Sequence, residues 1–180
     1  MMEDLRYPIG PMPTPENVTP QQLKKHIETI KSFPAKIKKA TSKLKPAQLN
    51  TVYREGGWMI KQVVHHTADS HCNAYLRFKL ALTEPNPAIK PYFESDWARL
   101  PDANENNLQH SYMLLEGLHH RWVLLMQNMT PRQWGKTYYH PQQQETFSLR
   151  TAAAMYAWHC EHHLAHITNL KKRKGWKTIL

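Results

Sequence analysis

Hydrophobic residues recur at intervals of three and four along four stretches of the chain, the spacing that places them on one face of a helix. The first stretch begins at Thr19, where Pro20 and Gln22 are typical of a capped helix start, and it continues to about residue 44 with a kink expected at Pro34. The other stretches cover about residues 58–82, 105–129 and 148–170. We therefore expect four amphipathic helices of about 20–25 residues each.

Three segments lack this spacing. Residues 1–18 contain four prolines and predict an extended N-terminal arm, which Tyr7 and Ile9 could anchor. Residues 83–104 form a long connection, and residues 138–147 predict a short hairpin before the last helix. The expected fold is therefore all-α: a four-helix bundle in a single domain, residues 19–180, preceded by the arm.

Composition agrees with one folded domain. The chain has 180 residues, of which 41% are hydrophobic, enough for one core. The mean hydropathy is −0.68, and no run approaches the roughly 18 apolar residues of a membrane span. The first ten residues lack the pattern of a secretory signal, so we expect a cytoplasmic location. The 2 cysteines do not make a disulfide framework.

The net charge of +10 and the pI of about 9.6 make the chain basic, and positive charge favours binding to the phosphates of nucleic acid. Many of the lysines, however, belong to the first helix and face outward, as on an ordinary solvated helix, and a second group lies at residues 171–177. No nucleic-acid-binding motif accompanies them. We therefore expect a small-molecule substrate and keep a nucleic-acid-binding bundle as an alternative.

Histidine is unusually abundant, with 12 residues against 14 acidic ones. Four histidines of the last helix lie within an arc of about 100°. Two histidines that lie four residues apart on a helix can both bind one metal ion. His159 and His163 are closest to the centre of the apolar face, and we predict that they are metal ligands. His162 and His166 lie toward the bundle seam or solvent and either support the site or only cap the helix face.

A metal site with an open position needs a third protein ligand. His66, at the margin of the apolar face of the second helix, is the better candidate, because His65 points about 100° away. Asp69, one turn further, could accept a proton from a ligating imidazole or orient a bound water. Glu161 lies on nearly the opposite face from His159 and is a poorer candidate.

Other polar residues have more ordinary interpretations. His119 shares the apolar stripe of the third helix and could line a pocket. Arg77 and Asn73 continue the line of His66 and could hold an anionic group of a substrate, although a structural salt bridge is the alternative for Arg77. Both cysteines face away from the predicted ligands. For the remaining histidines we expect ordinary hydrogen-bonded positions: His26, His71, His110, His120 and His140.

Three segments together resemble the DinB-like superfamily: GWMIKQVVHHTADSH at residues 57–71, WHCEHHLAHI at residues 158–167, and YPIG at residues 7–10. The nearest branch is that of the YfiT-type metal-dependent hydrolases. The resemblance implies a homodimer of four-helix bundles in which three histidines hold zinc or nickel, and these correspond to His66, His159 and His163. The wider superfamily often has Arg-Gly-Gln after the last ligand, where this chain has Leu-Ala-His, and this departure fits the YfiT-type branch.

Two kinds of reaction are compatible with such a site. Three neutral imidazoles leave a divalent ion its +2 charge, and such an ion lowers the pKa of a bound water toward about 7, which favours hydrolysis. The same ion could bind a thiolate, and the resemblance implies this alternative because the superfamily includes transferases of low-molecular-weight thiols such as bacillithiol. A non-catalytic metal-binding bundle is a further alternative. The substrate and the choice between these reactions remain open at the level of the sequence.

Overall fold

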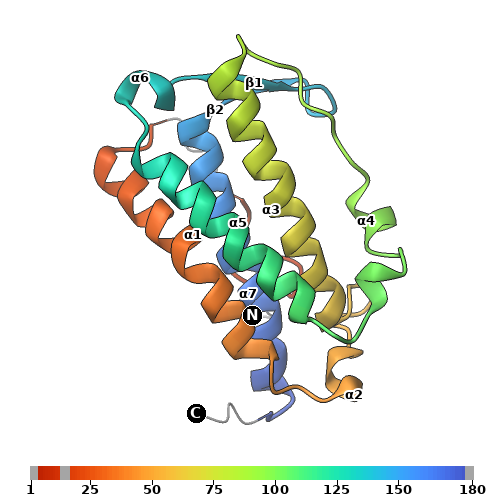
Figure 1. Ribbon diagram of the computed structural model, residues 1–180. Helices are drawn as coiled ribbons and strands as arrows, with labels where there is room; N and C mark the ends of the chain where they lie inside the picture. The colour runs from red at the N-terminus through yellow and green to blue at the C-terminus, as the bar shows by residue number, and fades with distance from the viewer. Residues whose placement is uncertain (1–3, 13–16, 177–180) are drawn as a thin grey trace.

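Four long helices form most of the computed structural model, which describes residues 4–12 and 17–176 (Figure 1). They are α1 (Pro20–Thr41), α3 (Ile60–Thr83), α5 (Gln109–Gln127) and α7 (Leu149–Arg173). Ile30, Phe78, Leu115 and Ile167, one from each helix, are fully buried in a common core. The predicted four-helix bundle is confirmed.

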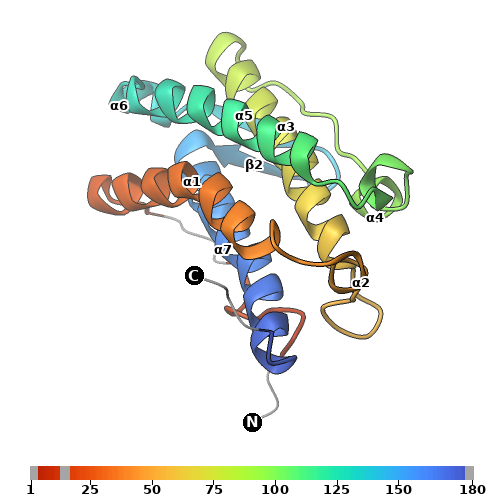
Figure 2. The same ribbon diagram turned by 60° about the horizontal axis from the view of Figure 1, so that its bottom comes forward.

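The order of the helices around the bundle determines which of them can share a site. Helix α1 packs against α5 and α7, and α3 packs against the same two helices. Figure 2 shows α3 beside α5 and α1 beside α7. Helices α3 and α7, which carry the predicted ligands, are therefore neighbours although residues 84–148 separate them in the sequence.

The helix boundaries predicted from the sequence agree only partly with the structure. At the start of α1, the Thr19 Oγ1 accepts a hydrogen bond from the Gln22 amide at 3.2 Å, and the Gln22 side chain accepts one from the Thr19 amide at 2.8 Å, so the predicted capping box is confirmed. The helix ends at Thr41, and Pro46 begins a separate short helix, α2 (Pro46–Leu49). Helix α5 begins at Gln109, four residues later than predicted, because side chains at 105 and 107 accept backbone hydrogen bonds in a turn.

The connections contain short elements that the periodicity did not indicate. These are α4 (Glu94–Trp97), a 3₁₀ helix η1 (Asp102–Asn104) and α6 (Pro131–Trp134). The predicted hairpin is confirmed as β1 (Thr137–His140) and β2 (Glu145–Ser148), paired antiparallel. It lies across the ends of α3 and α7 (Figure 1), and the Ser148 Oγ caps α7 by accepting from the Thr151 amide at 3.0 Å.

The described part of the N-terminal arm contacts the last helix. The Arg6 carbonyl lies 3.2 Å from His166 Nε2, and the Tyr7 ring lies 6.1 Å from that of His162. Ile9, expected as a second anchor, is 42% exposed. Residues 1–3 and 13–16 of the arm lie outside the described residues. None of the helices among the described residues is long and apolar enough to cross a membrane.

Candidate metal centre

Three histidines meet between α3 and α7. His159 and His163 lie one turn apart on α7, and His66 projects from α3. The Nε2 atom of His159 lies 3.3 Å from that of His66 and 3.1 Å from that of His163. One nitrogen from each ring lies within 4.8 Å of the others. The structure therefore brings together the three residues that the sequence singled out as ligands.

These separations can be compared with those of a metal site. Two imidazole nitrogens bound to one tetrahedral ion at roughly 2.0–2.1 Å are about 3.3 Å apart. The two separations at His159 are close to this value. Because the three donors are imidazole nitrogens with no carboxylate among them, the set suits zinc, nickel or another divalent transition metal rather than magnesium or calcium.

Metal binding also needs the three rings to be neutral, so that each has a lone pair to offer. Burial, followed by the charges of His162 and His166, lowers the pKa of His66 to about 3. Burial is also the largest cause that lowers the pKa values of His159 and His163 well below the usual value for histidine. All three imidazoles are therefore uncharged at neutral pH.

A tight turn before α3 places an aromatic side chain on the cluster. Gly56 has a φ of +62°, which favours glycine, and the Gly57 amide donates to the Arg54 carbonyl at 3.0 Å. After this turn, the ring of Trp58 lies 4.6 Å from that of His66 and 6.4 Å from that of His163. The indole covers one side of the cluster, which no feature of the helical periodicity indicated.

Two cavities meet at His159. One, of about 350 Å³, is lined by all three candidate ligands together with Trp58. The other, of about 630 Å³, extends from His159 along the space between α3 and α7 toward the hairpin. A molecule in the second cavity would therefore have the metal centre at one end. The wall of the second cavity also has polar side chains, two of them acidic: Ser70, Arg77, Tyr92, Glu94, Ser95, Asp96, His140, Gln142, Gln143 and Tyr156.

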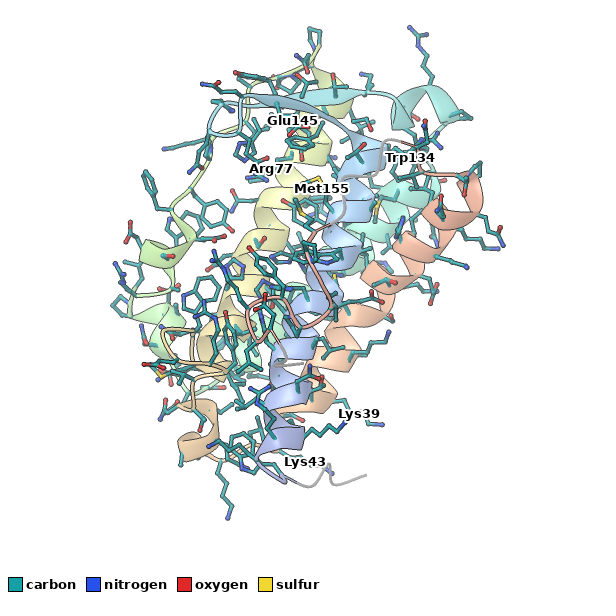
Figure 3. The ribbon with its side chains drawn as sticks, turned by 180° about the vertical axis from the view of Figure 1, so that it is seen from behind. Lys39, Lys43, Arg77, Trp134, Glu145 and Met155 are labelled. Atoms are coloured by element: carbon teal, nitrogen blue, oxygen red, sulfur yellow. The ribbon has the colours of Figure 1, made fainter. Side chains whose placement is uncertain are left out.

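Arg77 lies on this wall without a carboxylate partner. Its Nη1 donates to the Tyr156 hydroxyl at 3.0 Å, and among the described residues it forms no salt bridge. Figure 3 shows Arg77 and Met155 between α3 and α7, below the hairpin. Asn73 instead bonds its own helix, since its amide donates to the Asp69 carbonyl at 2.9 Å. Of the two residues predicted to hold an anionic group, only Arg77 lines the cavity.

Asp69 is not brought to the three histidines. Four residues apart, Asp69 and His65 share a face of α3 that is turned toward residues 101–105, where both line a separate hollow. Burial, and then the charge of Asp102, raises the pKa of Asp69 to about 6. The hydroxyl that does lie beside the cluster belongs to Ser70, whose Oγ is 3.4 Å from His159 Nε2. The prediction that Asp69 supports the ligands therefore has no geometric basis in the described residues.

The other two histidines of α7 lie on the arm side of the cluster. The His166 ring stacks on Tyr53 at 3.9 Å, and the His162 ring stacks on Trp158 at 4.3 Å. Burial lowers the pKa of each to about 4. Both histidines line the smaller cavity. Of the two positions expected for them, the bundle seam or the solvent, they therefore do not occupy the solvent side. Glu161 is exposed, in agreement with its exclusion.

Three interpretations of single residues change. His65, expected to point about 100° away from His66, is buried, and it joins α3 to α5 through Ser111 Oγ at 2.7 Å and to the segment before α5 through the Glu105 carbonyl at 2.9 Å. His71, expected in an ordinary position, is fully buried with its Nε2 3.0 Å from His159 Nδ1. Cys160, expected to face away, has its Sγ 3.9 Å from the same His71 nitrogen.

The bundle and its three converging imidazoles define a class: helical bundles with a candidate site for a divalent metal between neighbouring helices. Comparison with known proteins gives the family. The chain belongs to the DinB superfamily, whose family model matches residues 30–167. The resemblance seen in the sequence is confirmed.

Individual relatives cover almost the whole chain. The protein named "Putative metal-dependent hydrolase YfiT" in Bacillus subtilis (strain 168) is 45% identical over 173 residues, which is 96% of this chain and 97% of that protein. A "Putative metal-dependent hydrolase" of Bacillus pumilus (strain SAFR-032) is 48% identical over 175 residues, with 97% and 99% coverage. A solved structure of YfiT from Bacillus subtilis, described as a probable metal-dependent hydrolase with an unusual four-helix bundle topology, matches with a TM-score of 0.93 and covers 96% of this chain and 99% of that one.

Proposed function

We propose that the protein is a metal-dependent hydrolase in which His66, His159 and His163 hold one divalent ion and leave a position open to water. The observation that carries the proposal is the convergence of three neutral imidazole nitrogens beside a cavity. A divalent ion in such a site makes water a competent nucleophile near neutral pH. We expect zinc first, because imidazole donors at tetrahedral spacing suit it, and nickel second.

The larger cavity is proposed to hold the rest of the substrate. Arg77 is half-buried on its wall, and its side-chain hydrogen-bond partners, Tyr156 and Tyr138, are uncharged tyrosines. A guanidinium in this setting binds a carboxylate or phosphate well, because it presents several parallel N–H donors. The proposed substrate is therefore a small hydrolysable molecule with an anionic group at the end away from the metal.

Two alternatives make different predictions. A thiol transferase would use the same ion to bind the thiolate of a low-molecular-weight thiol such as bacillithiol. A nucleic-acid-binding bundle would use the basic surface, but part of that charge is engaged within the fold. Three lysines donate to backbone carbonyls at 2.6–2.7 Å: Lys61, Lys136 and Lys171.

The test combines metal analysis with two matched variants. We expect about one divalent ion per chain in the wild type and in His162→Ala, and loss of the ion and of hydrolysis in His163→Ala, because only His163 is a proposed ligand. Esters and amides, and thiols mixed with electrophiles, would be assayed in parallel. Turnover only with a thiol and an electrophile would replace the hydrolase by the transferase, and metal binding without any turnover would leave a non-catalytic bundle.

Two further outcomes would contradict the metal site itself. One is wild-type protein that contains no divalent ion and has the same melting temperature with and without a chelator. The other is equal loss of metal in the two variants. Salt-sensitive duplex binding in metal-free protein would favour the nucleic-acid alternative. The homodimer implied by the resemblance also stays a prediction, and light scattering would give twice the chain mass of 21.2 kDa.

A further inference from the structure

A line of imidazoles runs from the candidate metal centre into the core. His71 Nε2 lies 3.0 Å from His159 Nδ1, and His71 Nδ1 lies 2.8 Å from His119 Nε2. At the far end, His119 Nδ1 lies 2.6 Å from the backbone carbonyl oxygen of Ile30. The line thus connects three helices, α7, α3 and α5, and ends on a fourth, α1.

The carbonyl of Ile30 is available because of a proline. In a regular helix, this oxygen would accept a hydrogen bond from the amide of residue 34, four positions later. That residue is Pro34, which has no N–H and lies inside α1. The His119 ring supplies the missing donor. Pro34 therefore leaves a buried acceptor at the place where the line of histidines ends, inside a helix that continues from Pro20 to Thr41.

The acceptor at the end of the line fixes the proton on each ring. A carbonyl oxygen can only accept, so His119 Nδ1 carries a hydrogen and, in a neutral ring, His119 Nε2 is an acceptor. His71 Nδ1 must then donate to it, which leaves His71 Nε2 to accept from His159 Nδ1. The Nε2 atom of His159 is left with its lone pair, and this atom faces His66 and His163.

The surroundings keep the rings neutral and in place. His71 is fully buried and His119 is 2% exposed. Phe33 packs on both rings, with centroid distances of 5.2 and 5.8 Å, and Trp122 packs on both from another side. Burial lowers the pKa of His119 to about 4, partly opposed by its bond to Ile30. A charged ring in this apolar enclosure would be costly.

We propose that His71 and His119 are positioning residues for the metal centre. A chain of hydrogen bonds runs from the Ile30 carbonyl through both rings to His159, and it holds the His159 ring in the orientation and tautomer that ligation requires. The proposal rests on the metal site proposed above. Partners of this kind are usually a single carboxylate or carbonyl, and their loss typically weakens metal binding by about 10–100-fold. Here the carbonyl acts at a distance, through two intervening imidazoles.

The first test does not require metal. Nitrogen-15 NMR of the histidine rings in the metal-free protein distinguishes the two neutral tautomers. We expect His119, His71 and His159 all to carry the proton on Nδ1. A proton on Nε2 of His71 would break the line and overturn the proposal, whether or not the protein binds metal.

The second test measures zinc affinity by competition with a chelating dye, together with the visible spectrum of the cobalt form. We expect a 10–100-fold loss in His71→Phe and a smaller loss in His119→Phe. The double variant should be no weaker than His71→Phe alone, because His119 acts only through His71. Unchanged affinity in His119→Phe, or losses that add fully, would contradict the proposal. Wild-type protein that binds no zinc would instead contradict the proposed function.

Two controls separate positioning from general damage. His65→Phe removes a buried histidine of the same helix that is bonded to Ser111 and Glu105, and it should leave the cobalt spectrum and zinc affinity unchanged. Pro34→Ala changes no histidine but restores an amide that competes for the Ile30 carbonyl. It should shift the His119 Nδ1 proton resonance even if the phenylalanine variants fold poorly. An unshifted resonance would show that this carbonyl does not hold the line.

Discussion

Arg77 illustrates how one side chain can select a substrate. Its guanidinium donates to a tyrosine hydroxyl and forms no ion pair among the described residues, while it faces a cavity that ends at His159. Burial, and then the positive charge of Arg77, lowers the pKa of His140 on the same wall. The carboxylates of Glu94 and Asp96 also line this cavity, so its wall combines one permanent positive charge with acidic and neutral polar groups.

We expect Arg77→Gln to discriminate between substrates. For an ester that carries a carboxylate, KM should rise about 10–100-fold, since a hydrogen bond to a charged group contributes roughly 1.5–3 kcal/mol. For a neutral ester of the same shape, KM should change little. Steady-state kinetics on the two esters gives the comparison, and Arg132→Gln, which removes an exposed arginine of α6 that lines neither cavity, is the control. Equal effects on both esters would exclude a role in anion recognition.

The residues of the candidate site were predictable to different degrees. Side-chain directions on an ideal helix were enough to select His159 and His163 together and to prefer His66 over His65. They did not identify the role of His71, because its contact with His159 depends on how α3 and α7 pack. The position of Asp69 could not be predicted for a similar reason: it lies only about 60° from His66 around the helix, and packing turns that side toward residues 101–105.

At the scale of elements, α1 depends on a well-formed start. Thr19→Ala should lower the free energy of unfolding by about 1 kcal/mol, because it removes the oxygen that accepts from the Gln22 amide. Urea unfolding measures this loss. Thr168→Ala is the matched control, since Thr168 is exposed on α7 and alanine is the better helix former, so stability should stay equal or rise slightly. A similar loss in both variants would show that the capping box contributes little.

The long elements were predicted because their periodicity extends over five or more turns. Helices α2, α4 and α6 have four residues each, too few for any periodicity to appear. The late start of α5 has a local cause, since Asn107 accepts the Gln109 amide and ends the preceding turn. Here a side-chain oxygen accepts a backbone N–H that would otherwise belong to the helix. The spacing of apolar residues carries no information about such hydrogen bonds.

At the scale of the whole molecule, the buried histidines make metal-free protein sensitive to acid. The folded state keeps His119 neutral down to a pH of about 4, whereas the unfolded chain takes up its proton near the ordinary pKa of 6.5. The free energy of unfolding therefore falls as the pH drops from about 6.5 to 4, by up to about 3 kcal/mol from this residue. Asp69, with its pKa raised to about 6, opposes part of this loss.

Urea unfolding of the metal-free protein at pH 7 and pH 5 tests this prediction. Wild type should lose more stability between the two values than His119→Phe does, because the variant lacks the titrating ring while Asp69 contributes equally to both. The same loss in the two proteins would mean that His119 is not the neutral buried group described above.

The neighbouring positions of α3 and α7 also affect the order of events during synthesis. His66 and His159 are 93 residues apart in the chain, so closing the loop between them has an entropic cost that packing of the last helix must offset. A nascent chain that ends before α7 carries one proposed ligand of three and can only bind metal weakly. The centre thus becomes competent only when the final helix has docked, and metal retention would report that folding is complete.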